Sequence, residues 1–186
     1  VLEEQGRKLS EAFTEDQIDA GRRLFGGPSR FLLGVAKLEQ LPPERGVEIA
    51  FAGRSNVGKS SLLNLLAGEQ GLARVSPKPG FTKLINLFTM NKCWRLVDLP
   101  GYGHASVPGA IRATWGPMGE ALRQRESFGA VLLVVDSRRG VGDLDLGLLE
   151  WAGRPAARTH VLLSKADKLP SGQQIAFAWT RGYEPG

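Results

Sequence analysis

The chain has 186 residues, 42% hydrophobic and 23% charged, which suits one globular domain with a core and is too short for two ordinary domains. Its single cysteine excludes an internal disulfide and fits a reducing cytoplasm, and its longest apolar run, Ala130 to Val135, is too short to span a bilayer. The net charge of +5 favours a polyanionic partner such as nucleic acid, although the arginines are scattered and also suit an ordinary solvated surface.

Residues 1–46 are predicted to form a helix and a first strand that pack on the domain that follows. The first 25 residues look helical, and Thr14 to Gln17 has the sequence of a capping box. Residues 31–38 are a candidate strand, which the Pro42-Pro43 pair closes. Cys93, further along the chain, is expected to be a small buried side chain.

Residues 47–186 alternate apolar strands with helices. Strands are predicted at 47–52, 84–90, 94–97, 130–135 and 161–163, and helices at 60–66, 118–125 and 143–151. Residues 102–117 are rich in glycine and proline, which predicts a mobile loop. Strands that are apolar on both faces and alternate with helices indicate an α/β fold of three layers, with a mostly parallel sheet and helices on both faces.

The segment from Gly53 to Ser60, GRSNVGKS, matches G-x-x-x-x-G-K-[ST] at every fixed position. Its glycines let consecutive backbone N–H groups face a phosphate, and the N-terminus of the following helix adds its positive dipole end. Lys59 would lie opposite the β- and γ-phosphates, and the Ser60 hydroxyl would bind Mg²⁺. The predicted phosphate-binding residues are Gly53, Arg54, Ser55, Asn56, Val57, Gly58, Lys59, Ser60 and Ser61.

A second motif, D-x-x-G, ends the strand predicted at 94–97. An aspartate there can hold Mg²⁺ through a water, and the N–H of the glycine can contact a γ-phosphate. The tetrapeptide is common by itself, and its place after a phosphate loop makes it informative. Its residues are Asp98, Leu99, Pro100 and Gly101.

A third motif, SKAD, follows the strand predicted at 161–163. The Asp167 carboxylate can accept hydrogen bonds from N1–H and the exocyclic amine of guanine, whereas adenine offers no such pair of donors. In isolation the motif is also compatible with a solvated turn, and the order of the three motifs favours guanine. Its residues are Ser164, Lys165, Ala166 and Asp167.

Between the first two motifs lies Pro79-Gly-Phe-Thr82. A GTPase needs a threonine in this interval whose hydroxyl and backbone reach Mg²⁺ and the γ-phosphate, and a predicted strand follows Thr82. Gly80, Phe81 and Thr82 are therefore expected to bind the nucleotide, with Thr82 and Ser60 as the metal ligands.

The chain resembles the EngB family of ribosome-assembly GTPases, which are Era-like proteins with the Ras-like fold. The resemblance rests on EIAFAGRSNVGKSSLLN, SPKPGFTKLINLF, VDLPGYG and SKADKL, which lie between Glu48 and Leu169. It implies a Ras-like P-loop domain that binds GTP or GDP with Mg²⁺ and hydrolyses GTP slowly. It also implies assembly of the bacterial large ribosomal subunit on an rRNA partner and a link to cell division or septation. The chain is further expected to be a cytoplasmic monomer without membrane association.

Two positions bear on catalysis. Tyr102 follows Gly101 where many Ras-like enzymes place a water-orienting glutamine, so hydrolysis should be slow. In related GTPases that lack this glutamine, an asparagine at the position of Asn56 can help hold K⁺ beside the phosphates. The alternative is a loop asparagine that tolerates an unusual backbone angle. The expected catalytic residues are thus Asn56, Thr82 and Gly101.

Ser164 and the C-terminus differ from the pattern of the family. Serine takes the place of the usual asparagine or threonine, which predicts a modest affinity for the base. Only 19 residues follow Asp167, and none resembles the last guanine-contacting loop of Ras-like proteins. The domain at 47–186 is therefore expected to be incomplete, with residues missing near its C-terminus.

Three functions remain open at this point. The first is a Mg²⁺-dependent GTPase switch, and the second is an essentially non-catalytic, nucleotide-gated rRNA- or ribosome-binding module. Tyr102 favours the second somewhat, because it leaves no obvious catalytic group. A P-loop ATPase or small-molecule kinase is the third, and Asp167 counts against it.

Overall fold

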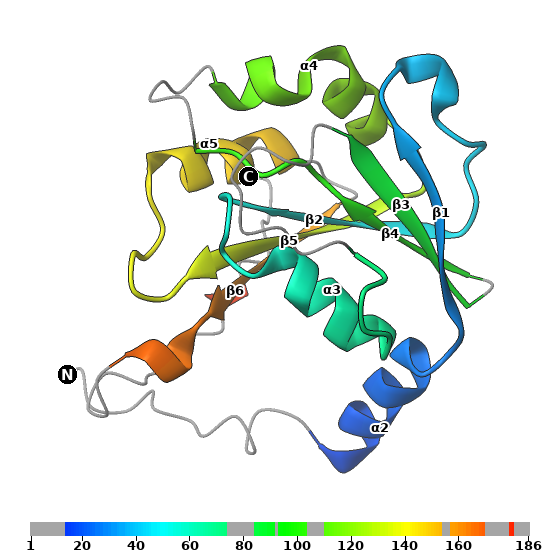
Figure 1. Cartoon of the computed structure of the whole chain (residues 1–186), viewed down its shortest axis with the longest axis vertical. Helices are drawn as coiled ribbons and strands as arrows, with labels where there is room; N and C mark the ends of the chain where they lie inside the picture. Colours follow the sequence, from blue (N-terminus) through cyan, green and yellow to red (C-terminus); the bar gives the residue numbers. More distant parts are fainter. Residues whose placement is uncertain are drawn as a thin grey trace, which may run out of the picture.

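The structure is a computed structural model, and it describes residues 14–73, 84–91, 93–103, 110–153, 157–169 and 179–180. These residues form a seven-stranded sheet in the spatial order β1-β3-β4-β2-β5-β6-β7 (Figure 1). The strands are β1 (Ser29–Val35), β2 (Val47–Gly53), β3 (Ile85–Met90), β4 (Trp94–Asp98), β5 (Phe128–Asp136), β6 (Arg158–Ser164) and β7 (Trp179–Thr180). The neighbours β4, β2, β5 and β6 run parallel, whereas β3 and β7 run antiparallel to the strands beside them. The mostly parallel sheet is thus confirmed.

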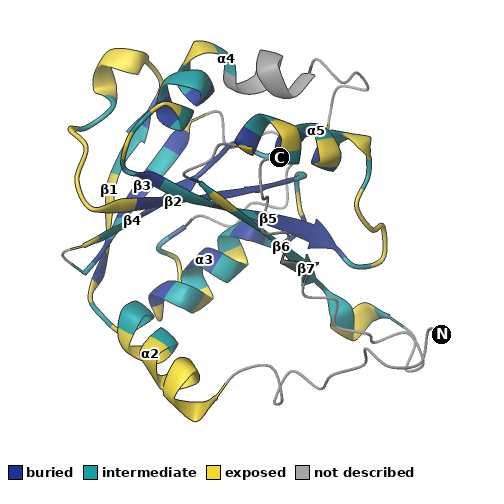
Figure 2. Cartoon of the chain, turned by 180° about the vertical axis from the view of Figure 1, so that it is seen from behind, coloured by how far each residue is buried: buried dark blue, intermediate teal, exposed yellow. Residues whose placement is uncertain are grey.

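Helices cover both faces of the sheet (Figure 1). The helices are α2 (Glu15–Phe25), α3 (Lys59–Ala67), α4 (Ala110–Arg123) and α5 (Asp143–Ala152), with short 3₁₀ helices η1 (Leu38–Gln40) and η2 (Ala166–Lys168). Helices α4 and α5 lie on one face, and α2 and α3 lie on the other. Figure 2 shows buried strands in the middle layer and exposed residues on the outer sides of α2 and α5. The three-layer α/β fold is confirmed.

Each face of the sheet has its own hydrophobic core. Leu122 and Leu148 belong to the core beneath α4 and α5, and Leu63 belongs to the core beneath α3. On β4, Val97 joins the first core and Leu96 the second, because successive side chains of a strand point to opposite faces. The strands are therefore apolar on both faces because each face packs against its own layer of helices.

The beginning of β2 carries a buried polar cluster around Glu48, which is fully buried. Its Oε2 accepts from Arg125 Nε at 2.7 Å and from Ser127 Oγ at 3.0 Å, and its Oε1 lies 3.3 Å from Arg95 Nη1. Burying a charge is costly unless it is paired and hydrogen-bonded, and Glu48 is both. The cluster connects β2 with β4 and with the segment that leads into β5.

The helix at the start of the described chain has the predicted cap. Gln17 N donates to Thr14 Oγ1 at 3.3 Å, and Thr14 N donates to Gln17 Oε1 at 3.0 Å. Strand β1 begins two residues earlier than predicted and ends at Val35, because the Gln40 side chain accepts from the backbone N–H groups of residues 36 and 37. Since β1 pairs with β3, it is a strand of the main sheet. The division of the chain at residue 46 stays a prediction.

The predictions for residues 110–117 and for Cys93 were wrong. Residues 110–117 were expected in a loop and instead begin α4. Proline disfavours the helical region for the residue before it, and at Pro117 the preceding Gly116 takes φ +47°, so the helix is kinked there rather than ended. Cys93 is exposed, because it lies in the β3–β4 turn, where its backbone N–H donates to Asn91 Oδ1 at 2.9 Å.

Strand β7 belongs to the C-terminal stretch for which the sequence offered no assignment. Its two residues pair antiparallel with β6, Thr180 opposite His160. Across the described ranges, no helix has both the length and the apolar character needed to cross a bilayer.

Candidate functional site

The three sequence motifs meet at one edge of the sheet. The glycine-rich loop from Gly53 to Ser60 follows β2, the segment from Asp98 to Gly101 follows β4, and the segment from Ser164 to Asp167 follows β6. These strands all run parallel, so their carboxyl ends lie at the same edge. Ligands of α/β sheets characteristically bind at this edge. We refer to residues 53–60 below as the phosphate loop.

The phosphate loop turns directly into helix α3. Gly58 precedes the helix with φ +104°, a backbone conformation that side chains rarely adopt, so a glycine is required there. The first residue of α3 is Lys59, and Ser60 follows in the same turn. A helix N-terminus behind a glycine turn offers its N–H groups to an anion. The loop therefore has the local geometry of a phosphate cradle.

Lys59 and Asp98 join the first two motifs. The Lys59 ammonium donates to the Asp98 carboxylate, and both residues are buried. Burial raises the pKa of Asp98 above its usual value, and the Lys59 charge opposes this effect. The interaction places the lysine expected at the phosphates beside the carboxylate expected at the metal.

The third motif holds the phosphate loop from the other side. Ser164 Oγ lies 2.6 Å from Val57 O, to which it donates, and 3.1 Å from the carbonyl oxygen of Val135. Lys165 Nζ donates to Asn56 O at 2.5 Å. The hydroxyl of Ser164 thus contacts the loop, and its expected role at the nucleotide stays a prediction. The Asp167 side chain is exposed, and one oxygen lies 3.1 Å from Lys168 Nζ.

Asn56 has a left-handed backbone, with φ +64°, and is exposed. Asparagine tolerates this conformation better than most residues. The observation suits the interpretation of Asn56 as a loop residue, and it is also compatible with a side chain that contacts an ion.

The remaining predicted residues are placed as follows. Leu99 is fully buried, and its N–H donates to Phe51 O at 3.0 Å. Pro100 is buried, Ser61 is exposed on α3, and Ala166 begins η2. Gly80, Phe81 and Thr82 lie outside the described residues, so the structure does not place the predicted threonine.

An aspartate that sequence reasoning missed stands at the end of β5. Asp136 is buried, and it accepts from Arg138 Nε at 2.9 Å and lies 3.1 Å from Lys165 Nζ. The Arg138 guanidinium and then the Lys165 ammonium hold the pKa of Asp136 far below its usual value, against the opposing effect of burial. Because Asp136 holds Lys165, it supports the contact between the third motif and the phosphate loop. An Asp-x-Arg sequence after an apolar strand was the available signal.

A second missed feature is the pair formed by Tyr102 and Asp145. Tyr102 was expected in a mobile loop but is buried, and its Oη donates to Asp145 Oδ1 at 2.5 Å. The two residues are far apart in the sequence, so no local pattern connects them. A side chain held in this way is not available to orient a water.

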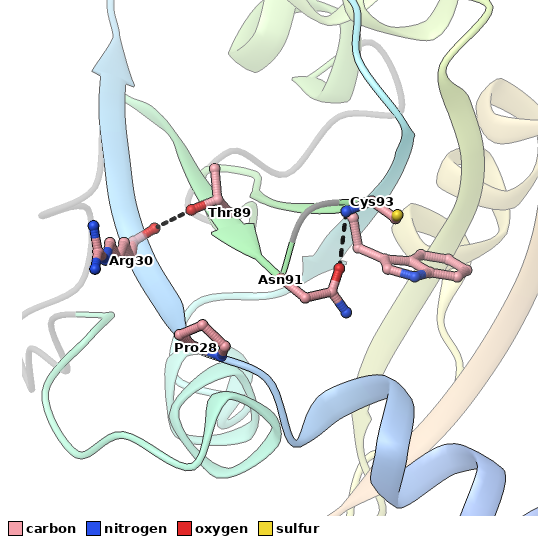
Figure 3. Close-up of a pocket in the computed structure, with 6 residues that line it drawn as sticks. Pro28, Arg30, Thr89, Asn91 and Cys93 are labelled. Atoms are coloured by element: carbon pink, nitrogen blue, oxygen red, sulfur yellow. Dashed lines mark hydrogen bonds between the residues drawn. The ribbon is translucent and has the colours of Figure 1, made fainter.

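Two cavities are lined by residues that the structure describes. One, of about 310 Å³, is lined by the phosphate loop, by Tyr102 and by the segment after β5. The other, a groove of about 620 Å³ between β1 and the β3–β4 turn, is lined by Pro28, Arg30, Thr89, Asn91, Cys93 and Trp94 (Figure 3). The groove is larger, but it lies at the start of β4, at the opposite edge from Asp98. The smaller cavity is therefore the one that adjoins the motifs.

The described residues include no cluster of three or more His, Cys, Asp or Glu side chains that could enclose a metal. Mg²⁺ does not require one, since it is commonly bound through one or two protein oxygens together with substrate phosphates. The Ser60 hydroxyl and the Asp98 carboxylate are oxygen donors of the kind it prefers. The residues present fit a magnesium–phosphate ligand.

A family model described as "50S ribosome-binding GTPase" matches residues 48–165. Curated proteins named probable GTP-binding protein EngB are similar over most of the chain. The protein of Francisella philomiragia is 50% identical over 142 residues, 76% of this chain and 72% of the relative. The proteins of Methylococcus capsulatus and Azoarcus are 46% and 50% identical over 77% of this chain and 69% of each relative.

Solved structures support the same fold. A point variant of Aquifex aeolicus Era bound to GDP.AlF4- superposes with a TM-score of 0.54 at 24% identity over 71% of this chain. Era in complex with MgGDPNP and nucleotides 1506-1542 of 16S ribosomal RNA superposes with a TM-score of 0.50 at 22% identity over 72% of this chain. This chain spans 44% and 45% of those two Era chains. At these identities the likeness shows the Ras-like fold alone.

Proposed function

Since the chain belongs to the EngB family of GTP-binding proteins, we propose that it is a nucleotide switch that binds GTP and GDP and hydrolyses GTP slowly. One observation carries the proposal: the phosphate loop is held between the other two motifs, by Lys59 with Asp98 on one side and by Ser164 and Lys165 on the other. In this arrangement a nucleotide whose phosphates lie on the loop has its γ-phosphate near Gly101 and its base near Asp167.

Magnesium belongs to this proposal. Ser60 would bind it directly and Asp98 through a water, with Thr82 as a further ligand. Bound there, Mg²⁺ would neutralise charge on the β- and γ-phosphates. The chain's own contribution is the cradle of N–H groups at the start of α3 and the Lys59 ammonium.

Slow hydrolysis follows from the position of Tyr102. Many Ras-like enzymes orient the attacking water with a glutamine at this position, whereas here the phenol is buried and bonded to Asp145. Gly101, Thr82 and Asn56 remain the proposed contributors to the reaction. The alternative, an essentially non-catalytic module that binds RNA only in one nucleotide state, is favoured by this same observation.

The proposed partner is the large ribosomal subunit or its rRNA, bound by a cytoplasmic monomer during subunit assembly. The family description names 50S binding, and the net charge of +5 suits a polyanion. A link to cell division or septation is part of the proposal only through the family.

The test of the proposed function begins with the affinities of the purified chain for GTP, GDP and ATP in Mg²⁺. We expect both guanine nucleotides to bind and ATP to bind at least about a hundredfold more weakly, because adenine lacks the donor pair that Asp167 would accept. GTP turnover is then measured with and without large ribosomal subunits. Slow turnover that the subunits accelerate supports the switch, nucleotide-dependent subunit binding without turnover supports the non-catalytic module, and equal ATP affinity contradicts both.

Potassium is proposed as an activator through Asn56. A cation beside the phosphates would supply positive charge where negative charge develops in the transition state, and we expect turnover in KCl to exceed that in NaCl at equal ionic strength by about tenfold. Asn56→Ala should abolish the difference. Because φ is +64° at this position, alanine also strains the loop, so Asn56→Gly is the matched control that removes the side chain without strain. Equal rates in the two salts for the wild-type chain would leave Asn56 as a loop residue only.

A further inference from the structure

Tyr102 directly follows the D-x-x-G motif, and its side chain is buried. The residue is 2% exposed, and its ring belongs to the core beneath α4 and α5. A buried hydroxyl without a partner costs free energy, and here Oη donates to Asp145 Oδ1 at 2.5 Å. Asp145 is itself only 1% exposed, and its Oδ2 accepts from the backbone N–H of Gly142 at 2.9 Å. Tyr102 therefore joins the segment after β4 to the first turn of α5.

The backbone of Tyr102 is bonded to the phosphate loop. Its N–H donates to Gly53 O at 3.4 Å, and its carbonyl oxygen accepts from Ser55 N at 2.9 Å. Residue 102 is thus held from two directions, by the phosphate loop through its backbone and by α5 through its side chain. Gly103 comes next and is exposed. Within the described range 93–103, Tyr102 is therefore the last buried residue.

Gly101 directly precedes Tyr102 and adjoins these attachments. A Cβ at this position would approach Ser55 Oγ to 3.0 Å and Ser55 N to 3.2 Å, so the backbone of Gly101 packs closely on the phosphate loop. The Gly101 N–H belongs to the peptide between Pro100 and Gly101, and the two backbone dihedrals of Gly101 connect this peptide to the one that Tyr102 holds. A displacement of Tyr102 would therefore move this donor relative to the loop.

The phenol keeps its proton under the conditions in which a nucleotide binds. Burial, and next the hydrogen bond to Asp145, raise the pKa of Tyr102, while the nearby Arg54 guanidinium opposes them. Arg54 extends toward α5, since a Cβ on Gly142 would lie 3.9 Å from its Nη1. Oη remains a donor throughout the neutral range, so the connection to Asp145 does not vary with pH there.

We propose that the hydrogen bond between Tyr102 and Asp145 positions the Gly101 N–H for the γ-phosphate and so favours GTP over GDP. The inference rests on the proposed function, in which Gly101 contacts that phosphate. GDP lacks the γ-phosphate, so a displaced Gly101 N–H would weaken the binding of GTP and leave the binding of GDP unchanged. The chain can distinguish GTP from GDP only through contacts that one nucleotide makes and the other does not, and the contact of the Gly101 N–H with the γ-phosphate is of this kind. Tyr102 and Asp145 are positioning residues in this proposal, since they act through the Gly101 backbone and the Tyr102 hydroxyl is bonded to Asp145.

The test compares Tyr102→Phe, Asp145→Ala and the double variant in the full chain. Dissociation constants for GDP and for a non-hydrolysable GTP analogue are measured in Mg²⁺ by competition with a fluorescent nucleotide. We expect each single variant to bind the GTP analogue about tenfold more weakly and GDP within about twofold of the wild-type value. The double variant should lose the same tenfold and no more, because both substitutions remove the same hydrogen bond between Tyr102 and Asp145. Asp145→Ala also removes the contact with the Gly142 N–H, which should lower stability without changing the ratio of the two affinities.

Met90→Ala is the control for general destabilisation. Met90 is 1% exposed and belongs to the core on the other face of the sheet. It should lower the unfolding temperature and leave the ratio of the two affinities unchanged. If Tyr102→Phe weakens both nucleotides equally, or lowers the unfolding temperature and changes neither affinity, the positioning role is refuted. If the wild-type chain binds neither nucleotide, the proposed function itself is refuted, which is a different result.

Discussion

Lys59→Ala is expected to lower the affinity for both GTP and GDP by about a hundredfold. Lysine at the end of a glycine-rich loop supplies a full positive charge to the β- and γ-phosphates, and a hydrogen bond between charged groups is worth about 1.5–3 kcal/mol. The N–H cradle at the start of α3 survives the substitution, so weak binding should persist. Isothermal titration with each nucleotide in Mg²⁺ measures the loss. Unchanged affinities would contradict the assignment of residues 53–60 to phosphate binding.

The contact between Lys59 and Asp98 complicates this experiment and shows how to control it. Both side chains are buried, so removing the lysine leaves a buried carboxylate without that partner, at a cost of about 3–5 kcal/mol of unfolding free energy. A loss of binding could then reflect partial unfolding. The double variant Lys59→Met/Asp98→Asn replaces the charged pair with neutral groups of similar size. It should recover stability in urea denaturation without recovering nucleotide affinity, and recovery of both would assign the lysine a structural role only.

Asp167→Asn is expected to exchange a preference for guanine for a preference for xanthine. The carboxylate would accept from guanine N1–H and from the exocyclic amine, whereas an amide can donate to the 2-oxo group of xanthine. We expect GTP affinity to fall and XTP affinity to rise, each by about a hundredfold. Competition of GTP and XTP against a fluorescent nucleotide, for wild type and variant, measures the exchange.

The exposure of Asp167 makes this substitution clean. Its side chain is 69% exposed and contacts Lys168 on the surface, so no core contact is lost. Lys168→Met is the matched control, since it removes the neighbouring charge and leaves the carboxylate. If Asp167→Asn binds GTP as the wild type does and ignores XTP, Asp167 does not read the base.

The features of the site that could be predicted are those formed by residues adjacent in the sequence. The phosphate loop requires its glycines, lysine and serine in one short segment between a strand and a helix, so sequence spacing alone located it. The cap at Thr14 is local in the same way. Apolar runs located the strands, and parallel strands placed the later motifs at the same edge, although no local pattern states which strands are neighbours.

The features that could not be predicted depend on that strand order. Lys59 and Asp98 are 39 residues apart, and Tyr102 and Asp145 are 43 residues apart. Each pair meets because β2 lies between β4 and β5. The apolar content of the strands does not predict this order. For the same reason the sequence does not reveal that the Ser164 hydroxyl contacts Val57 O. Composition also misled at residues 110–117, where glycine and proline kink a helix and do not break it.

The buried cluster around Glu48 has a consequence at the opposite end of the sheet. Glu48 stands opposite Arg95 on β4, and three residues further along the same pair of strands Phe51 stands opposite Asp98. If β2 slid by one residue against β4, Glu48 would be buried without Arg95, and every side chain of the strand would change faces. The same slide would carry the phosphate loop about 3.3 Å along the strand axis, away from Asp98. A carboxylate at the other end of β2 from the phosphate loop thus helps to determine the alignment in which Lys59 and Asp98 meet.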